Sequence, residues 1–113
     1  MKQATRKPTT VGDVLQYEYL EPLDLKINDL AEILHVHRNT VSALVNNNRK
    51  LTTDMAFRLA KAFDTSVDFW CNLQSAVDLW EVENDMRAQE ELNRIMSVKD
   101  FVAQRNVATK KVA

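Results

Sequence analysis

Glycine and proline, the residues that most often interrupt regular structure, are nearly absent from this chain of 113 residues. It holds one glycine, Gly12, and two prolines, Pro8 and Pro22. No segment alternates apolar and polar residues as strands do, and apolar residues recur instead at helical spacing. The sequence therefore predicts an all-helical fold, and its length suits one domain with a short extension.

Capping residues mark the starts of the expected helices, because a hydroxyl or carboxylate oxygen can accept the free N–H groups of a first turn. Thr10 with Asp13 fits the start of a first helix, which Pro22 is expected to end. Two short helices follow at about residues 27–34 and 38–46, judged from their apolar spacing.

The second half of the chain contains a longer helix with an excess of apolar residues. Thr52 or Thr53 fits the start of a fourth helix, and Thr65 with Asp68 that of the longest, at about residues 66–86. Because its apolar residues cover more than one face, we expect core contacts on one side and a second copy of the chain on the other. We favour core packing together with this homodimer contact over a small-molecule pocket, and the predicted dimer interface consists of Phe69, Trp70, Leu73, Val77 and Trp80.

Composition divides the chain into three expected parts. Residues 1–9 are polar and predict a flexible N-terminal arm, residues 10–86 the helical domain, and residues 87–113 a C-terminal tail of one or two weaker helices that Ser97 and Asp100 help to start. The single cysteine and the lack of an N-terminal apolar run lead us to expect a cytoplasmic protein without a membrane segment.

The second and third expected helices, joined by a turn at residues 35–37, have the pattern of a helix-turn-helix. Ala31 is small enough for the two helices to cross closely, and Val41 and Leu44 follow at the spacing needed to close a small core. In such a motif the second helix, called the recognition helix, inserts its first turn into the major groove of DNA.

Polar side chains at the start of the recognition helix suit the edges of bases. Arg38 matches the two acceptors of guanine, Asn39 matches adenine, and the methyl group of Thr40 can contact thymine. We expect phosphate contacts from N–H groups at helix starts and from nearby polar side chains. The predicted DNA-binding residues are Asn28, His37, Arg38, Asn39, Thr40, Ser42, Ala43, Asn46, Asn48, Arg49 and Lys50.

Charge is distributed unevenly along a chain whose net charge is only −1. The segment from His35 to Phe63 has five cations and one acid, a net charge of +4, whereas the residues from Asp64 onward carry −3. A basic middle suits a DNA backbone and an acidic segment suits a basic protein, although solvated faces alone can give the same imbalance.

Two parts of the chain have a familiar pattern: LAEILHVHRNTVSALVNNNRKLTTDMAFRLAKAF, shared in pattern with many repressors, and DFWCNLQ followed by DLW. Through them, the chain resembles the lambda-repressor-like helix-turn-helix proteins of the XRE type over about residues 10–83. The second part is specific to the HigA-type antitoxins, also called the VapI group. This resemblance implies a domain of about five helices in a dimeric regulator that represses its own operon. In many members, the protein also neutralises a RelE-like toxin that cleaves mRNA.

Four positions depart from the pattern of that family; one is Val11, where the family often has proline, and the other three lie in or just after the helix-turn-helix. Its usual glycine in the turn is His35 here, and its usual glycine after the recognition helix is Asn47. Both positions favour a left-handed backbone, which asparagine and histidine adopt more readily than most residues. A cation that is common late in the recognition helix is Ala43, so we expect base reading to shift to Arg38 and Asn39.

Two other classes of function stand as alternatives to a DNA-binding repressor. The first is an antitoxin whose acidic segment, from Asp78 to Glu91, binds a small basic RelE-like toxin, with DNA contact secondary. The second is an enzyme, which we do not expect, because no Ser-His-Asp order, paired acids or glycine-rich loop is found. His35 and His37 have no cysteine or carboxylate cluster beside them, so we expect neither a metal nor a cofactor.

Overall fold

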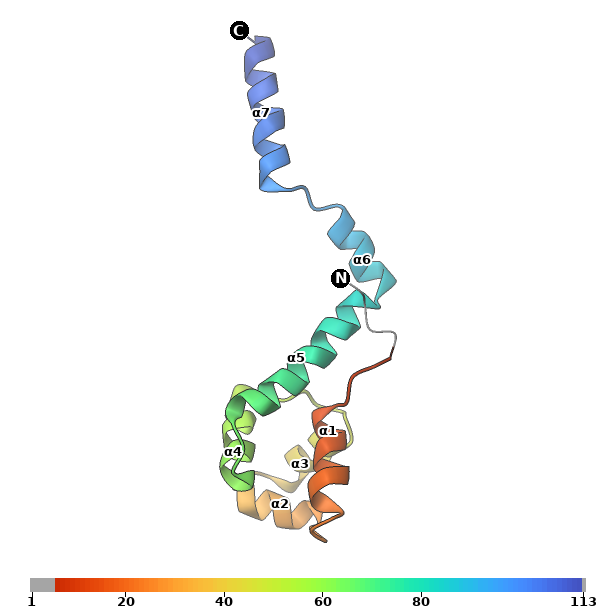
Figure 1. Ribbon diagram of the computed structural model, residues 1–113, viewed down its shortest axis with the longest axis vertical. Coiled ribbons are helices and arrows are strands. Elements are labelled where there is room, and N and C mark those ends of the chain that lie inside the picture. Colours follow the sequence, from red (N-terminus) through yellow and green to blue (C-terminus); the bar gives the residue numbers. More distant parts are fainter. Residues whose placement is uncertain (1–5, 113) are drawn as a thin grey trace. The chain divides into compact units, whose positions relative to one another are not determined.

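The computed structural model describes residues 6–112, and the side chains of residues 6–107 (Figure 1). The described residues form helices and connecting turns and contain no strand, which confirms the all-helical prediction. Residues 1–5 of the predicted arm lie outside the described part. The helices are α1 (Val11–Val14), η1 (Leu15–Leu20), α2 (Ile27–Leu34), α3 (Arg38–Val45), α4 (Thr53–Phe63), α5 (Val67–Glu83), α6 (Met86–Asn93) and α7 (Val98–Val112).

The chain divides into two compact units, one ending at Glu81 and the other beginning at Val82. In the first unit, α1 starts as predicted, because the Thr10 hydroxyl accepts the Asp13 N–H at 3.1 Å. It continues directly into the π-helical turns of η1, which end shortly before Pro22. The Thr52 hydroxyl accepts the Met55 N–H at 3.2 Å and begins α4, as expected.

The start of α5 differs from the prediction. The Ser66 hydroxyl, rather than that of Thr65, accepts the N–H of Phe69 at 3.0 Å. The Thr65 hydroxyl instead accepts the indole N–H of Trp70 at 2.7 Å. A buried indole N–H needs a hydrogen-bond partner, and this tertiary demand takes the hydroxyl that the local pattern assigned to helix capping.

The core of the first unit gathers side chains from each of its helices. Its largest fully buried side chains are Leu15, Leu30, Val41, Leu59 and Trp70. The rings of Tyr19, Phe63 and Trp70 pack together, with centroids 4.1 Å apart for Tyr19 and Phe63. Aromatic packing therefore fixes the start of α5 against η1 and the end of α4.

Trp70 departs from its expected place in a homodimer interface. Its side chain is 0% exposed within the single chain, so no surface is left for a second copy to contact. Val77 is also buried, whereas Leu73 and Trp80 are half-buried and Phe69 is 39% exposed. Trp70 is thus a core residue, because its ring completes the aromatic cluster.

Gly12, the only glycine of the chain, lies where α1 meets the end of α3. A Cβ atom at this position would lie 2.5 Å from the carbonyl oxygen of Leu44 and 2.6 Å from that of Val45. These distances are shorter than any normal carbon–oxygen contact. The close crossing of the two helices therefore requires glycine, for packing reasons rather than for a left-handed backbone.

The second unit contains α6, α7 and the turn between them. The Asp85 carboxylate accepts N–H groups at the start of α6, a cap that was not predicted. The Ser97 hydroxyl accepts the Asp100 N–H at 3.0 Å, as predicted for the tail. None of the α6 side chains is buried. In residues 6–112, no helix is both long enough and apolar enough to span a membrane.

Candidate nucleic-acid interface

The turn between α2 and α3 has the backbone that the sequence predicts. His35 adopts a left-handed conformation with φ of 56°, and the Val36 N–H donates to the carbonyl of Ala31 at 3.1 Å. This bond closes the end of α2 and reverses the chain. Ala31, Val41 and Leu44 are buried, which confirms the small core inferred from their spacing. The motif is therefore a packed helix-turn-helix.

Arg58 of α4 holds the end of α2 in place. Its Nη1 donates to the Leu34 carbonyl at 2.7 Å, and its Nε donates to the Asp54 carboxylate at 2.8 Å. The last carbonyls of a helix have no partner within it, and a cation stabilises that end of its dipole. Arg58 thus supports the turn from behind, a role that its sequence position did not reveal.

The first turn of α3 displays the predicted reading residues. His37 precedes the helix and its Nδ1 accepts the Asn39 N–H at 3.1 Å, so the neutral ring carries its proton on Nε2. Arg38 and Asn39 are exposed and Thr40 is half-buried. The helix start is therefore fixed by histidine, while the side chains that follow it are available to a ligand.

The structure brings some of the predicted DNA-binding residues together. Asn28 at the start of α2 and Arg38 line one open hollow of about 670 Å³. Ser42 and Asn46 bond to each other, since the Asn46 amide donates to the Ser42 carbonyl at 2.9 Å and reaches its hydroxyl at 3.3 Å. Their side chains are therefore partly committed within α3. Ala43 beside them is half-buried.

The loop after α3 is shaped by Asn47. Its φ is 62°, the left-handed backbone expected at this family position, and its amide donates to the Asp13 carboxylate at 3.3 Å. The Asn48 N–H donates to the Ala43 carbonyl at 2.8 Å, and Asn48 is exposed to solvent. Asn47 thus serves the backbone and a contact with α1.

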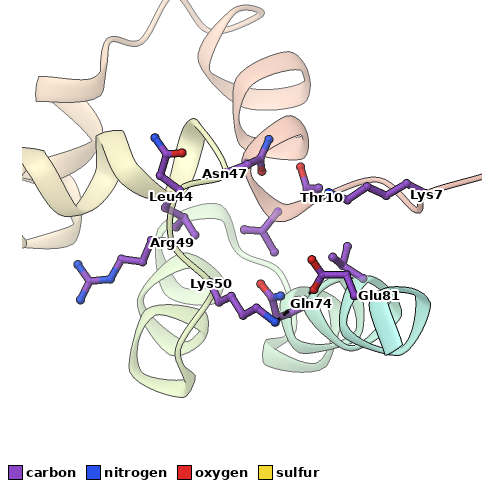
Figure 2. A pocket seen from close by; sticks show the side chains of 12 residues that line it. Lys7, Thr10, Leu44, Asn47, Arg49, Lys50, Gln74 and Glu81 are labelled. Atoms are coloured by element: carbon purple, nitrogen blue, oxygen red, sulfur yellow. Dashed lines mark hydrogen bonds and ion pairs between the residues drawn. The ribbon is translucent and has the colours of Figure 1, made fainter. Parts of the chain in front are cut away.

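Arg49 and Lys50 leave this loop in opposite directions (Figure 2). The Nη1 of Arg49 reaches back to the Thr40 hydroxyl at 3.4 Å, beside the predicted reading residues. The Lys50 ammonium lies 2.9 Å from Asp78 Oδ1 and 3.3 Å from Glu81 Oε1, both on α5. The two neighbouring cations therefore contact different parts of the chain.

The contact between Lys50 and α5 shifts the titration of both partners. The hydrogen bonds that the Lys50 ammonium donates to Asp78 and Glu81 raise the pKa of Lys50 above its ordinary value of 10.5. The hydrogen bond from Lys50 lowers the pKa of Asp78 below its ordinary value of 3.8. The ion pair therefore keeps its charges across neutral pH, is lost in acid as Asp78 protonates, and is lost in strong base as Lys50 deprotonates.

A pocket of about 230 Å³ lies between the start of α1, the loop after α3, and α5 (Figure 2). Lys7, Asn47 and Gln74 are among the residues that line it. It lies beside the recognition helix rather than at its exposed start. Within residues 6–112, no group of three His, Cys, Asp or Glu side chains could hold a metal ion.

Sequence reasoning missed five residues that support the site: Gly12, Arg58, Gln74, and Asp78 and Glu81 in their pairing with Lys50. Gly12 could have been found as the only glycine in the chain. Gln74 and Asp78 lie four residues apart on one helix, which indicates a shared face but not what that face contacts.

A buried crossing of α2 and α3, with polar side chains exposed at the start of α3, defines a helix-turn-helix protein. Comparison with known proteins agrees, since the helix-turn-helix family model HTH_3 matches residues 17–70. Beyond that class, the chain belongs to the family of helix-turn-helix transcriptional regulators that includes the HigA antitoxins.

Three relatives illustrate the family. The chain is 77% identical over 113 residues, the full length of both proteins, to the HTH-type transcriptional regulator YbaQ of Escherichia coli (strain K12). It is 46% identical to antitoxin HigA-1 of Vibrio cholerae, over 80% of this chain and 84% of that protein. The solved structure of Pseudomonas aeruginosa antitoxin HigA with the higBA promoter has a TM-score of 0.72 and 34% identity, covering 81% of this chain and 99% of that one.

Proposed function

We propose that this chain is a sequence-specific repressor that binds a pseudo-palindromic operator as a homodimer in the cytoplasm. One observation supports the proposal most strongly: the polar first turn of α3 is exposed, while the rest of that helix is anchored by Val41, Leu44 and Val45. A rigid helix that presents polar side chains at its start suits insertion into the major groove. The P. aeruginosa HigA structure with promoter DNA supports the same use.

Base reading is assigned to Arg38 and Asn39. Both are exposed at the start of α3, and a guanidinium and an amide can each make paired hydrogen bonds to guanine and adenine. Thr40 is half-buried and already contacts Arg49, so its methyl group offers the smaller contact. We therefore expect Arg38 and Asn39 to dominate sequence preference.

Phosphate contacts are assigned to residues around the reading pair. His37 can donate from Nε2, because its Nδ1 is occupied by the Asn39 N–H. Arg49 is directed to the same end of α3, and Asn28 and Asn48 are both exposed. Ser42 and Asn46 would have to break their mutual contacts before they could bind a phosphate, so we expect them to contribute less to DNA affinity.

Dimerisation would place two copies of α3 in successive major grooves, about 34 Å apart along the DNA. Phe69, Leu73 and Trp80 keep part of their surface exposed on α5 of the single chain. Apolar surface on that helix supports a second copy as the partner.

Titration of a labelled duplex from the region upstream of its own gene tests this function. The wild-type chain should bind with an affinity that falls as salt rises. Arg38→Ala or Asn39→Ala should each weaken binding roughly 5- to 150-fold, since a paired base contact contributes about 1–3 kcal/mol. Glu32→Ala, an exposed change on α2, is the control and should bind like wild type. Salt-independent binding, or unchanged affinity in both variants, would contradict the proposal.

A second candidate function is neutralisation of a small basic toxin, favoured by the likeness to antitoxin HigA-1. Co-purification with a small basic protein encoded beside this gene, and rescue of growth from it, would support this function. Failure to rescue growth, together with intact operator binding, would indicate a stand-alone regulator.

A further inference from the structure

Lys50 is the cation that turns away from the recognition helix. Its ammonium lies within 3.3 Å of one oxygen from each of two carboxylates, Asp78 and Glu81. One positive charge faces two negative charges, so the cluster of Lys50, Asp78 and Glu81 carries a net negative charge, although Lys7 and Arg49 line the same pocket. A DNA phosphate that approached Lys50 would have to compete with two carboxylates for its ammonium.

The carboxylates belong to a connected set of side chains on one face of α5. The Gln74 carbonyl oxygen accepts the backbone N–H of Leu51 at 2.9 Å, and its amide donates to Asp78 at 2.9 Å. Gln74, Asp78 and Glu81 recur at helical spacing, so they face the same way. Figure 2 shows Lys50 extended toward this face beside Gln74 and Glu81. α5 therefore holds both the backbone of the loop and its lysine.

We propose that Asp78 and Glu81 are positioning residues that set DNA affinity by competing with the DNA backbone for the ammonium of Lys50. The inference rests on the DNA-binding function proposed above. In wild type the carboxylates keep Lys50 out of the phosphate contacts, which leaves Arg49 as the cation of this loop that faces DNA.

The strength of this competition follows from exposure. The Lys50 side chain is 66% exposed and those of Asp78 and Glu81 are 46% and 45% exposed. Ion pairs in water are weak and are screened by salt. The carboxylates therefore moderate DNA affinity and do not abolish it.

The test compares salt-dependent DNA affinity among four chains: wild type, Asp78→Asn/Glu81→Gln, Lys50→Met, and the triple variant. The probe is one labelled duplex from upstream of its own gene. Amides keep the size of the carboxylates and can still bond to Gln74, while they remove the charge. Glu18→Gln/Asp68→Asn is the matched control, because it changes net charge equally at exposed residues far from the loop in sequence.

Asp78→Asn/Glu81→Gln should bind about two- to fivefold tighter at ~0.15 M salt, the range expected for an exposed ion pair. Its slope of log affinity against log salt should steepen by about 0.9, because the freed Lys50 neutralises one more phosphate. Lys50→Met should keep the wild-type slope, and the triple variant should lose the steepening. The control should keep the wild-type slope.

Three results would overturn the inference. The first is a slope of log affinity against log salt about 0.9 shallower in Lys50→Met, which would show that Lys50 already contacts phosphate. The second is an unchanged slope in Asp78→Asn/Glu81→Gln, and the third is a steeper slope that persists in the triple variant or appears in the control. If the wild-type chain binds DNA but the variants do not show the predicted salt slopes, this inference alone is overturned. A wild-type chain without salt-dependent binding overturns the DNA-binding function as well.

Discussion

At the scale of single residues, Gly12 is the position where one added methyl group has the largest expected effect. Alanine is normally favoured over glycine within a helix by about 1 kcal/mol, so an unhindered site would gain stability. Here the Cβ would meet two backbone carbonyls at 2.5 and 2.6 Å, and backbone cannot rotate aside. We expect Gly12→Ala to lower the free energy of unfolding by about 1–3 kcal/mol in urea titrations.

The control for Gly12→Ala is Glu18→Ala, an exposed change further along the same helical run, which should be nearly neutral. A Gly12→Ala chain as stable as wild type would show that α1 and α3 do not cross as closely as described.

At His35, unlike at Gly12, a substitution is expected to raise the free energy of unfolding. Its φ of 56° costs an ordinary side chain about 1–2 kcal/mol, a strain that glycine avoids. Glycine also gains freedom in the unfolded chain, which offsets part of the benefit. We expect His35→Gly to raise the free energy of unfolding by about 0.5–1 kcal/mol, whereas His35→Ala should not raise it. Calorimetric melting of both variants checks this, and a stabilised His35→Ala would contradict the strain argument.

The glycine positions of the resembled family predicted a left-handed backbone at two residues, whereas the left-handed Asp24 and Asp64 were not predicted. The left-handed conformations expected at His35 and Asn47 are both present. The partners of Lys50 were not predictable in the same way, because Asp78 and Glu81 lie 28 and 31 residues further along the chain. A single sequence shows that a cation and an acid exist but not that folding brings them together.

At the scale of helices, the link from α4 to the end of α2 depends on Arg58. Replacing it by methionine keeps an unbranched apolar stem, removes the guanidinium and leaves the Leu34 carbonyl without its charged donor at 2.7 Å. We expect Arg58→Met to reduce the free energy of unfolding by about 1–2 kcal/mol, since the site is partly exposed. Lys61→Met, at an exposed position of the same helix, is the matched control, and it should change the free energy of unfolding by close to zero.

Equal stability of Arg58→Met and Lys61→Met in urea titrations would show that Arg58 does not support the turn.

The helices themselves were largely predictable, because Thr10, Thr52 and Ser97 cap them through local contacts. Thr65 was assigned wrongly, because its hydroxyl bonds to Trp70 across the fold of the chain.

At the scale of the whole molecule, the proposed homodimer depends on α5. Phe69 is 39% exposed and shares a stripe of that helix with Leu73 and Trp80, whereas Leu79, 63% exposed, lies off this stripe. We expect Phe69→Glu to shift the sedimentation of the chain from dimer toward monomer, because a charge would be buried at the interface. Leu79→Glu should remain a dimer. A monomeric wild type, or dissociation by Leu79→Glu, would contradict this interface.

The reading role of α3 in a dimer is tested most directly by footprinting the region upstream of the chain's own gene. Two protected major-groove segments should appear about one helical turn apart, and both should be lost with Arg38→Ala while the variant keeps its fold and its dimer. DNA reading by this helix would be contradicted if Arg38→Ala still protects these segments. It would also be contradicted if the folded wild-type chain gives no protection even at low salt.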